Sequence, residues 1–418
     1  MVWQYHKKMT REELKAEISG IAESLKKQGK KHLAKCIEEN WDKTAREYSR
    51  ELNTYHPTKG MEKEMFLAFD IELARLDTPE NLKKKILASL QSRRVLQTAP
   101  HLGVTEGPRM LSINWLGSLA VPEAEFYVVG MFSGIPFSNN FRPGRINRKE
   151  SSINLFPSSL QDGLVYRSLI QEKLVDTVKD LPPEISKFLT ETRVGESYTK
   201  WALWGCQNIE RKILGKENLI FLDINEVVSN YLVQVLKNKE HIFYKIFFEQ
   251  KTREEFTKMF PNEIMFYFPA TEGKYEQMEN VFFNNGALES KHQRIALDND
   301  EDLIEELKNS RLCPALITGF MSLAFLNQFK CLGSFAQVEY LPAYQKKLAQ
   351  LESLKGQGIE SVPTANLTTG TLGENLYPVD ILLGEKFSPK SETLFGELLI
   401  PIKEVLLKSY FTGDEKEK

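Results

Sequence analysis

The stretch VLQTAPHLGVTEGPRML, residues 95–111, decides the fold class of this chain. A short, mostly apolar run, VLQ, precedes a loop that carries two glycines and two prolines, and the apolar LSINWLGSLAV follows from residue 111. This order predicts a strand, a loop and a helix. In open α/β folds such a loop lies at the carboxyl edge of the sheet, where ligands bind. The stretch therefore predicts an α/β core that begins near residue 95, with a candidate site in its first loop.

Neighbouring segments extend this core. EFYVVGMF, residues 125–132, contains a continuous run of apolar, β-branched and aromatic residues, which is typical of a strand buried on both faces. The strand-like IMFYFP then reopens the α/β pattern after a long helical stretch. We expect five regions in chain order: a helical N-terminal region (1–94), the first half of the α/β core (95–160), a helical insertion (161–262), the second half of the core (263–350), and a C-terminal loop and helix (351–418).

Helix signals fill the N-terminal region. The sequence TREE, which starts at Thr10, has the spacing of a capping box, and apolar residues from Leu14 to Leu25 recur on one helical face. Further helices are expected at 32–52, 61–75 and 80–93, the last preceded by a proline near its first turn. The sequence therefore predicts four helices before the core.

Composition excludes several classes of function. The chain has 418 residues, of which 41% are hydrophobic and 27% charged, and its formal net charge is −2, so no global field attracts nucleic acid or anionic lipid. The four cysteines show no C-x-x-C spacing and the six histidines no H-x-x-x-H pair, so no local metal site is expected. The sequence shows no signal-peptide pattern and no apolar run of about 18 residues, which predicts a cytoplasmic protein without a membrane span.

The first candidate site is the loop at 98–111. His101 can donate to a phosphate or act as an acid or base near neutral pH, and Arg109 can pair with a carboxylate or phosphate. Gly103 and Gly107 permit close backbone approach to a cofactor, and the following helix start offers free N–H groups to an anion. The spacing matches neither G-x-G-x-x-G nor a Walker loop, and it lacks the second histidine of the H-x-G-H motif of nucleotidyl transferases. The alternative is a turn between two packed elements.

The second candidate follows the strongest strand signal. Ser133, Asn139 and Asn140 are small polar residues just beyond that strand, and Arg142, Arg145 and Arg148 come next, interleaved with a proline and a glycine. Several arginines in one turn of a nearly neutral protein predict a clamp for a carboxylate or phosphate. An exposed basic loop is the alternative reading of the same residues.

The third candidate lies between residues 331 and 345. Ser334, Gln337, Glu339 and Tyr340 stand close together, after a glycine and before a helix. Glu339 can hold an ammonium group, or act as a base if it is removed from water. Alternatively, Glu339 caps a helix or pairs with a neighbouring arginine.

Two of these segments together resemble a known family, the cysteine-adding enzymes of bacillithiol biosynthesis. The family's loop "tGQQaGLfTGPlY" is similar to TAPHLGVTEGPRML, with four residues in register, which are Gly103, Thr105, Gly107 and Pro108. The family's late segment "lsPn.llRP…yvgGpgEiaYwaql" is similar to residues 311–348, with four more in matching places, which are Pro314, Gly333, Glu339 and Tyr340.

This resemblance implies a Rossmann-like parallel-sheet core with helical insertions, and a crevice for an amino acid and a phosphorylated or sugar-like partner. It also implies a homodimer and adds Thr105 to the substrate-binding residues. Two motifs differ from the family pattern. GMFSGIPFSNN replaces the acidic "ateDHDf", and His101 with Leu102 replaces the glutamine pair. A shared scaffold would therefore carry a changed reaction or substrate.

We therefore predict a ligase or transferase that joins or modifies an amino acid or amine and an anionic co-substrate. In this hypothesis His101 is the acid or base, the arginines of the second candidate hold the anion, and Glu339 holds the amine. A nucleotide, ATP or ADP, is the cofactor considered, and a small molecule rather than nucleic acid is the partner. The alternative is a non-catalytic metabolite-binding or protein-interaction protein, because serine and asparagine bind ligands well but transfer protons poorly.

Overall fold

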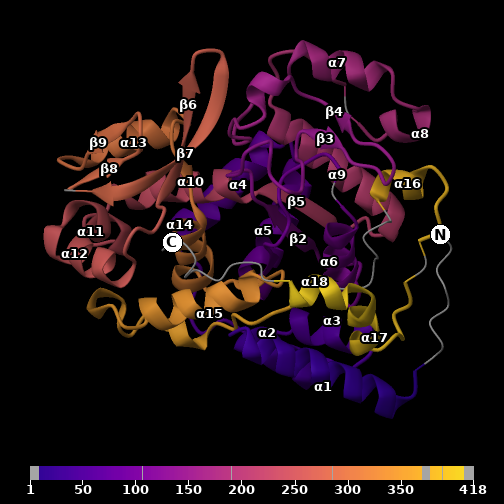
Figure 1. The fold of residues 1–418 in the computed structure, drawn as a ribbon. Helices are drawn as coiled ribbons and strands as arrows, with labels where there is room; N and C mark the ends of the chain where they lie inside the picture. The colour runs from indigo at the N-terminus through magenta and orange to yellow at the C-terminus, as the bar shows by residue number, and fades with distance from the viewer. Residues whose placement is uncertain are drawn as a thin grey trace.

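A four-stranded parallel sheet forms the centre of the molecule in the computed structural model, which describes residues 9–105, 107–189, 191–284, 286–369, 377–387 and 389–408 (Figure 1). Its strands, in spatial order, are β11 (Lys330–Leu332), β1 (Val95–Gln97), β2 (Tyr127–Met131) and β5 (Leu219–Asp223). Every residue of these strands is buried, as expected for parallel strands covered on both faces. The predicted strands VLQ and EFYVVGMF are confirmed as β1 and β2.

The strand order brings the first and last strands of this sheet together. Helix α6 (Pro108–Ser118) connects β1 to β2, whereas β11 returns after more than 200 residues to pair with β1. The pairing matches Gln97 with Leu332, and Thr98 N donates to Leu332 O just beyond it. Because the two strands are parallel, the loops that follow them leave the sheet side by side at its carboxyl edge.

The N-terminal region is helical, as predicted, but its described residues, 9–94, form five helices instead of four. These are α1 (Arg11–Lys27), α2 (Lys31–Asn40), α3 (Ala45–Asn53), α4 (Lys63–Arg75) and α5 (Glu80–Arg93). The capping box of Thr10 and Glu13 is confirmed at the start of α1. The single helix expected at 32–52 is two helices, because Thr44 and Glu47 form a second capping box that starts α3.

The region at 161–262 is not a continuous helical insertion. It contains six helices, which are α7 (Glu172–Lys179), α8 (Pro183–Ser186), α9 (Tyr198–Leu214), α10 (Ile224–Val235), α11 (Ile242–Phe248) and α12 (Gln250–Met259). However, β5 lies between α9 and α10 and is a member of the central sheet. The strand was missed because NLIFLD is short and lies between long helical patterns. Before this region, a small hairpin pairs β3 (Arg145–Ile146) with β4 (Ile153–Asn154), and a 3-10 turn, η1, covers Ser158–Leu160.

The segment expected to be the second half of the α/β core forms mostly a separate antiparallel sheet, and only β11 joins the parallel one. The antiparallel sheet has five strands in spatial order, β10 (Cys313–Pro314), β6 (Phe266–Glu272), β7 (Tyr275–Asn284), β8 (Ala287–Glu289) and β9 (Arg294–Ala296). Figure 1 shows it beside the parallel sheet, with α13 (Asp300–Lys308) near it. IMFYFP therefore contributes to a strand, but this strand is antiparallel to its neighbours. The apolar pattern of the segment does not reveal the direction of the neighbouring strands.

Helical segments complete the chain and return to its beginning. They are α14 (Leu316–Phe320), a π-helical turn η2 (Met321–Leu326), α15 (Gln337–Leu348), the 3-10 turns η3 (Glu352–Leu354) and η4 (Ile359–Ser361), α16 (Pro378–Leu382), α17 (Phe395–Leu399), η5 (Ile400–Ile402) and α18 (Lys403–Leu407). Figure 1 shows α17 and α18, in yellow, against the indigo helices of the N-terminal region. In the described part of the chain, no helix combines the length and apolarity needed to cross a membrane.

Close packing of α6 on the sheet gives a first prediction. A Cβ atom on Gly117 would overlap the hydroxyl of Tyr127 in β2, which accepts a hydrogen bond from Gln97 Nε2 at 3.0 Å. We expect Gly117→Ala to lower the free energy of unfolding by about 1–3 kcal/mol, the cost of overpacking a core. Urea denaturation measures this change.

Gly20→Ala is the matched control, because Gly20 is an exposed residue in α1 and a Cβ atom added there would meet nothing within 4 Å. In this variant alanine favours the helix, so we expect a gain of about 0.5–1 kcal/mol. Equal effects of the two substitutions would contradict the contact between α6 and β2.

Candidate functional site

A cavity of about 480 Å³ opens where β1, β2 and β11 end. Its wall includes seven of the residues predicted from the sequence, which are His101, Arg109, Asn139, Asn140, Ser334, Gln337 and Tyr340. They come from all three predicted segments, so the tertiary structure brings the three candidate loops to one place. The rest of the wall is largely apolar, which is usual for small-molecule sites.

His101 is held at the cavity by both its backbone and its ring. Its backbone continues the pairing of β1 with β2 through a parallel bridge to Phe132. Its Nδ1 lies 3.1 Å from Asn139 Oδ1, and its ring meets the ring of Phe141 edge to face at 4.7 Å. Because Asn139 Oδ1 also accepts the N–H of Phe141, this atom is an acceptor and Nδ1 carries the proton. Nε2 is therefore free to accept a proton.

Burial of the imidazole lowers the pKa of His101, and the hydrogen bond to Asn139 opposes this shift only in part. The neutral form therefore predominates at pH 7, because the ordinary pKa of histidine is already about 6.5. A neutral imidazole with a free Nε2 has the protonation state of a general base.

Arg109 supplies a positive charge to the same cavity. It lies in the first turn of α6, and its guanidinium carbon is 5.7 Å from the centre of the Phe141 ring. Among the described residues, no carboxylate lies within ion-pair distance of Arg109. The guanidinium is therefore oriented by an aromatic ring and keeps its hydrogen-bond donors for a ligand.

Three residues of the first loop shape it instead of lining the cavity. Thr105 Oγ1 accepts the N–H of Asn147 at 2.8 Å, which joins this loop to the residue that follows β3. A Cβ on Gly103 would lie 3.2 Å from Pro143 Cα, so Gly103 permits that close approach between the loops. Gly107 precedes α6 as its N-cap residue. The expected contacts of Thr105 with substrate and of the glycines with a cofactor do not fit these positions.

The predicted arginine clamp does not form. Arg142 is exposed in a left-handed turn, and Arg145 lies in β3; neither lines the cavity. Arg148 pairs with Asp380 at 2.9 Å. Ser133 is fully buried below the cavity, where its hydroxyl donates to Asp223 Oδ1 at 2.8 Å. The alternative of an exposed basic loop describes Arg142, whereas Arg145 and Arg148 are partly buried.

Glu339 is also outside the cavity. Its Oε1 accepts the N–H of Leu33 at 2.7 Å, so this carboxylate caps the start of α2, and burial raises its pKa. The expectation that Glu339 holds an amine in the crevice is therefore corrected in favour of the capping alternative. Its neighbour Gln337 does face the site and donates to Thr98 Oγ1 at 2.8 Å, which ties α15 to the end of β1.

Asn225 is the most connected site residue that the sequence reasoning missed. Its Oδ1 accepts the N–H groups of Ser133 and Gly134 at 2.8 and 3.0 Å, and its Nδ2 donates to Pro314 O at 2.7 Å. It thus fastens the loop after β2 to β10. The sequence contains a short signal for this position, since NLIFLDIN has the pattern of a strand followed by the start of a helix. Tyr267 and Met278, by contrast, reach the cavity from the antiparallel sheet, and no local motif predicts that.

A buried ionic cluster supports the loop after β2 from below. Asp223 accepts from Ser133, its main-chain N–H donates to Glu72 Oε1 at 2.9 Å, and Glu226 lies one turn along α10. Arg75 binds Glu72 at 2.6 Å and Arg167 binds Glu226 at 2.7 Å, so two guanidinium groups face three carboxyl groups. Burial and the two neighbouring carboxylates raise the pKa of Asp223 to about 8, which favours the protonated form of this carboxyl group at neutral pH.

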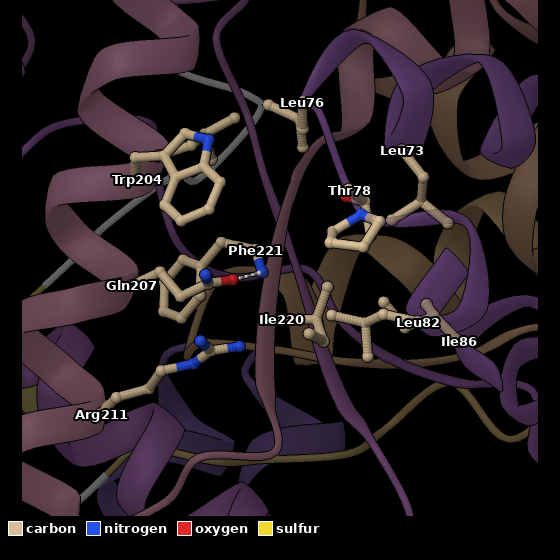
Figure 2. Close-up of a pocket in the computed structure, with 12 residues that line it drawn as sticks. Leu73, Leu76, Thr78, Leu82, Ile86, Trp204, Gln207, Arg211, Ile220 and Phe221 are labelled. Atoms are coloured by element: carbon tan, nitrogen blue, oxygen red, sulfur yellow. Dashed lines mark hydrogen bonds between the residues drawn. The ribbon is translucent and has the colours of Figure 1, made fainter. Parts of the chain in front are cut away.

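A second hollow, shown in Figure 2, is a poor site. Its volume is about 60 Å³, roughly enough for two waters, and its walls come mainly from α4, α5, α9 and β5. Two of its polar side chains are already paired, since Gln207 Oε1 accepts the N–H of Phe221 at 2.9 Å and Arg211 donates to Leu219 O. In the described residues, no group of three or more His, Cys, Asp or Glu side chains is arranged to hold a metal ion.

Comparisons with known proteins do not assign this chain to a family. The sequence matches no protein-family model and no curated protein. The resemblance to the cysteine-adding family therefore depends only on the residues quoted for it, and function has to be argued from the cavity.

The ionic cluster gives a prediction about pH. The unfolded chain releases the Asp223 proton near pH 4, whereas the folded chain keeps it until about pH 8. Asp223 therefore contributes to the free energy of unfolding at low pH. This contribution falls as the pH rises from about 4 to about 8, by up to about 1.4 kcal/mol per pH unit. Asp223→Asn cannot titrate, so its free energy of unfolding, relative to the unmodified protein, should rise from pH 5 to pH 8.

Urea denaturation at pH 5, 6.5, 8 and 9 measures this difference. Asp162→Asn is the control for the loss of one carboxylate, because Asp162 is exposed on the surface. A constant difference between Asp223→Asn and the unmodified protein across this range would mean that Asp223 is ionised in the folded state.

Proposed function

We propose that this chain is a ligase or transferase that acts on an anionic small molecule, bearing a carboxylate or phosphate, in the cavity at the edge of the parallel sheet. The observation that carries this proposal is the presence of His101 and Arg109 in one wall, each with its functional atoms available. Arg109 would bind the anion, and His101 would move the proton.

The electrostatics of the cavity favour an anion. Arg109 has no carboxylate partner among the described residues, and the described part of the cavity wall contains no aspartate or glutamate. A guanidinium in a largely apolar wall attracts an anion more strongly than one in water, because the effective dielectric constant is lower. An anionic ligand would therefore supply the charge that balances Arg109.

His101 is suited to remove a proton from a nucleophile. Asn139 fixes the ring by accepting from Nδ1, so Nε2 presents its lone pair, and burial keeps the imidazole neutral. An ammonium group must lose a proton before its nitrogen can attack a carbonyl or phosphoryl centre. An amine or amino acid therefore remains the proposed co-substrate. His101 serves as its base, because Glu339 lies outside the cavity.

The topology of the sheet supports a Rossmann-like core. Numbered by their order in the chain, the four parallel strands lie in the order 3-2-1-4, from β5 to β11. Doubly wound folds share this order and bind ligands where it reverses, between the first and fourth strands. The cavity wall includes residues that follow β1 and β11, and apolar walls there can accept a nucleotide such as ATP or ADP.

A non-catalytic binding protein is the second candidate. It is favoured by one observation, namely that His101 is oriented by an asparagine and no carboxylate of the described cavity wall stands beside it. A base that develops positive charge during a reaction is usually stabilised by such a carboxylate. In this case the cavity would bind the anion without turnover.

Calorimetric titration of the full chain with ADP, ATP and amino acids tests the proposal. We expect binding of an anionic ligand that Arg109→Ala weakens by about tenfold or more, since a hydrogen-bonded charge pair contributes about 1.5–3 kcal/mol. His101→Ala should leave binding largely intact and abolish product formation, which is followed by mass spectrometry of substrate mixtures. If binding is seen without turnover in the unmodified protein, the second candidate is the correct one.

Arg142→Ala is the matched control, because this arginine is exposed and lies outside the cavity wall. Equal weakening by Arg109→Ala and Arg142→Ala would contradict the proposed site and indicate a general effect of charge. The homodimer stays a prediction, and light scattering on the purified chain tests it.

A further inference from the structure

We propose that the start of α15 binds a phosphate group of the ligand, together with the hydroxyl of Thr369. The inference rests on the proposed function, because it uses the same cavity. It narrows the ligand from an anion to a phosphorylated molecule and assigns the phosphate to a part of the cavity that the proposed function does not use.

The start of α15 opens into the cavity. Residues 334–337 all belong to its wall, and the first helical hydrogen bond runs from Val338 N to Ser334 O at 3.1 Å. The N–H groups of Phe335, Ala336 and Gln337 therefore form the first turn. Within the described parts of the chain, no acceptor lies in hydrogen-bond range of these three groups, and no side chain caps the helix. Free N–H groups and the helix dipole together attract an anion.

Thr369 provides an independent indication of a ligand. This residue is 2% exposed and lines the cavity, yet its Oγ1 has no hydrogen-bond partner in the described structure. Thr368 places it beside the helix start, since both its N–H and its hydroxyl donate to Gly333 O, at 3.0 and 2.9 Å. A buried hydroxyl without a partner is costly, so a ligand oxygen at this position would stabilise the site by pairing with it.

The number and type of donors favour a phosphate over a carboxylate. Three N–H groups and one hydroxyl are available at this end, and the three terminal oxygens of a phosphate monoester accept more hydrogen bonds than the two of a carboxylate. The start of α6, which the sequence suggested as the anion site, is a poorer one. Pro108 has no N–H there, and Met110 N already donates to Gly107 O at 3.1 Å.

The remaining wall indicates what the phosphate is attached to. Phe335 and Tyr340 come from the same segment as the phosphate donors, and Tyr267, Met278 and Leu316 form apolar surface from other elements. Aromatic and apolar side chains of this kind pack against flat ring systems. The ligand class is therefore a phosphorylated molecule with an apolar or planar part, for which ADP is a suitable probe.

Two variants of the full chain test this inference by calorimetry with inorganic phosphate, ADP and acetate. Ala336→Asp puts a negative charge at the helix start, which helices favour, so the melting temperature without ligand should stay equal or rise while phosphate and ADP affinity falls at least tenfold. Thr369→Val keeps the side-chain shape and removes a hydroxyl that has no partner in the described structure, so folding should be unchanged and affinity should fall about tenfold.

The outcomes separate the two proposals. Unchanged phosphate and ADP affinity in both variants overturns this inference. If Arg109→Ala still weakens binding of acetate or ADP in that case, the proposed function survives and the anion binds elsewhere in the cavity. Absence of any anion binding to the unmodified chain overturns both proposals. Arg142→Ala serves again as the control for net charge.

Discussion

The pairing of β1 with β11 is the contact on which the site depends. It joins Val95 to Lys330 and Gln97 to Leu332, across more than 200 intervening residues. The pairing continues past the strands, because Thr98 donates to Leu332 O through both its N–H and its hydroxyl, and Gln337 donates to Thr98 Oγ1. Two loops that are remote in sequence therefore form one wall, and without this pairing neither the start of α15 nor Thr369 would reach the end of β1.

Buried polar side chains then fix the loops at this edge. A buried backbone N–H or C=O group requires a partner, and irregular segments cannot supply it from regular secondary structure. Asn225 satisfies the N–H groups of Ser133 and Gly134, Gln97 Oε1 accepts the N–H of Ala99, and Thr105 accepts the N–H of Asn147. The first turn of α15 and the hydroxyl of Thr369 stand out against this background. These unpaired donors are the observation on which the proposed phosphate site rests.

Local signals predicted the elements well where one short segment contains the whole cause. The capping box at Thr10 starts α1, the proline before residue 80 precedes α5, and the apolar run of EFYVVGMF becomes β2. A second capping box, at Thr44 and Glu47, was equally visible in the sequence and divides the helix expected at 32–52. IMFYFP shows the limit, because a strand pattern does not reveal whether the partner strand is parallel or antiparallel.

The amino-acid sequence alone was enough to identify an α/β chain, its helical first quarter, and three polar loops that each contribute residues to the cavity wall. Periodicity, capping and turn residues act within a few positions, so they can be read along the chain. Only the tertiary structure showed that His101 and Arg109 face the cavity while Arg142, Arg145 and Glu339 do not. The direction of a side chain depends on which distant element packs against its segment. For Glu339 that element is α2, and for Ser133 it is the start of α10, and neither contact leaves a local pattern.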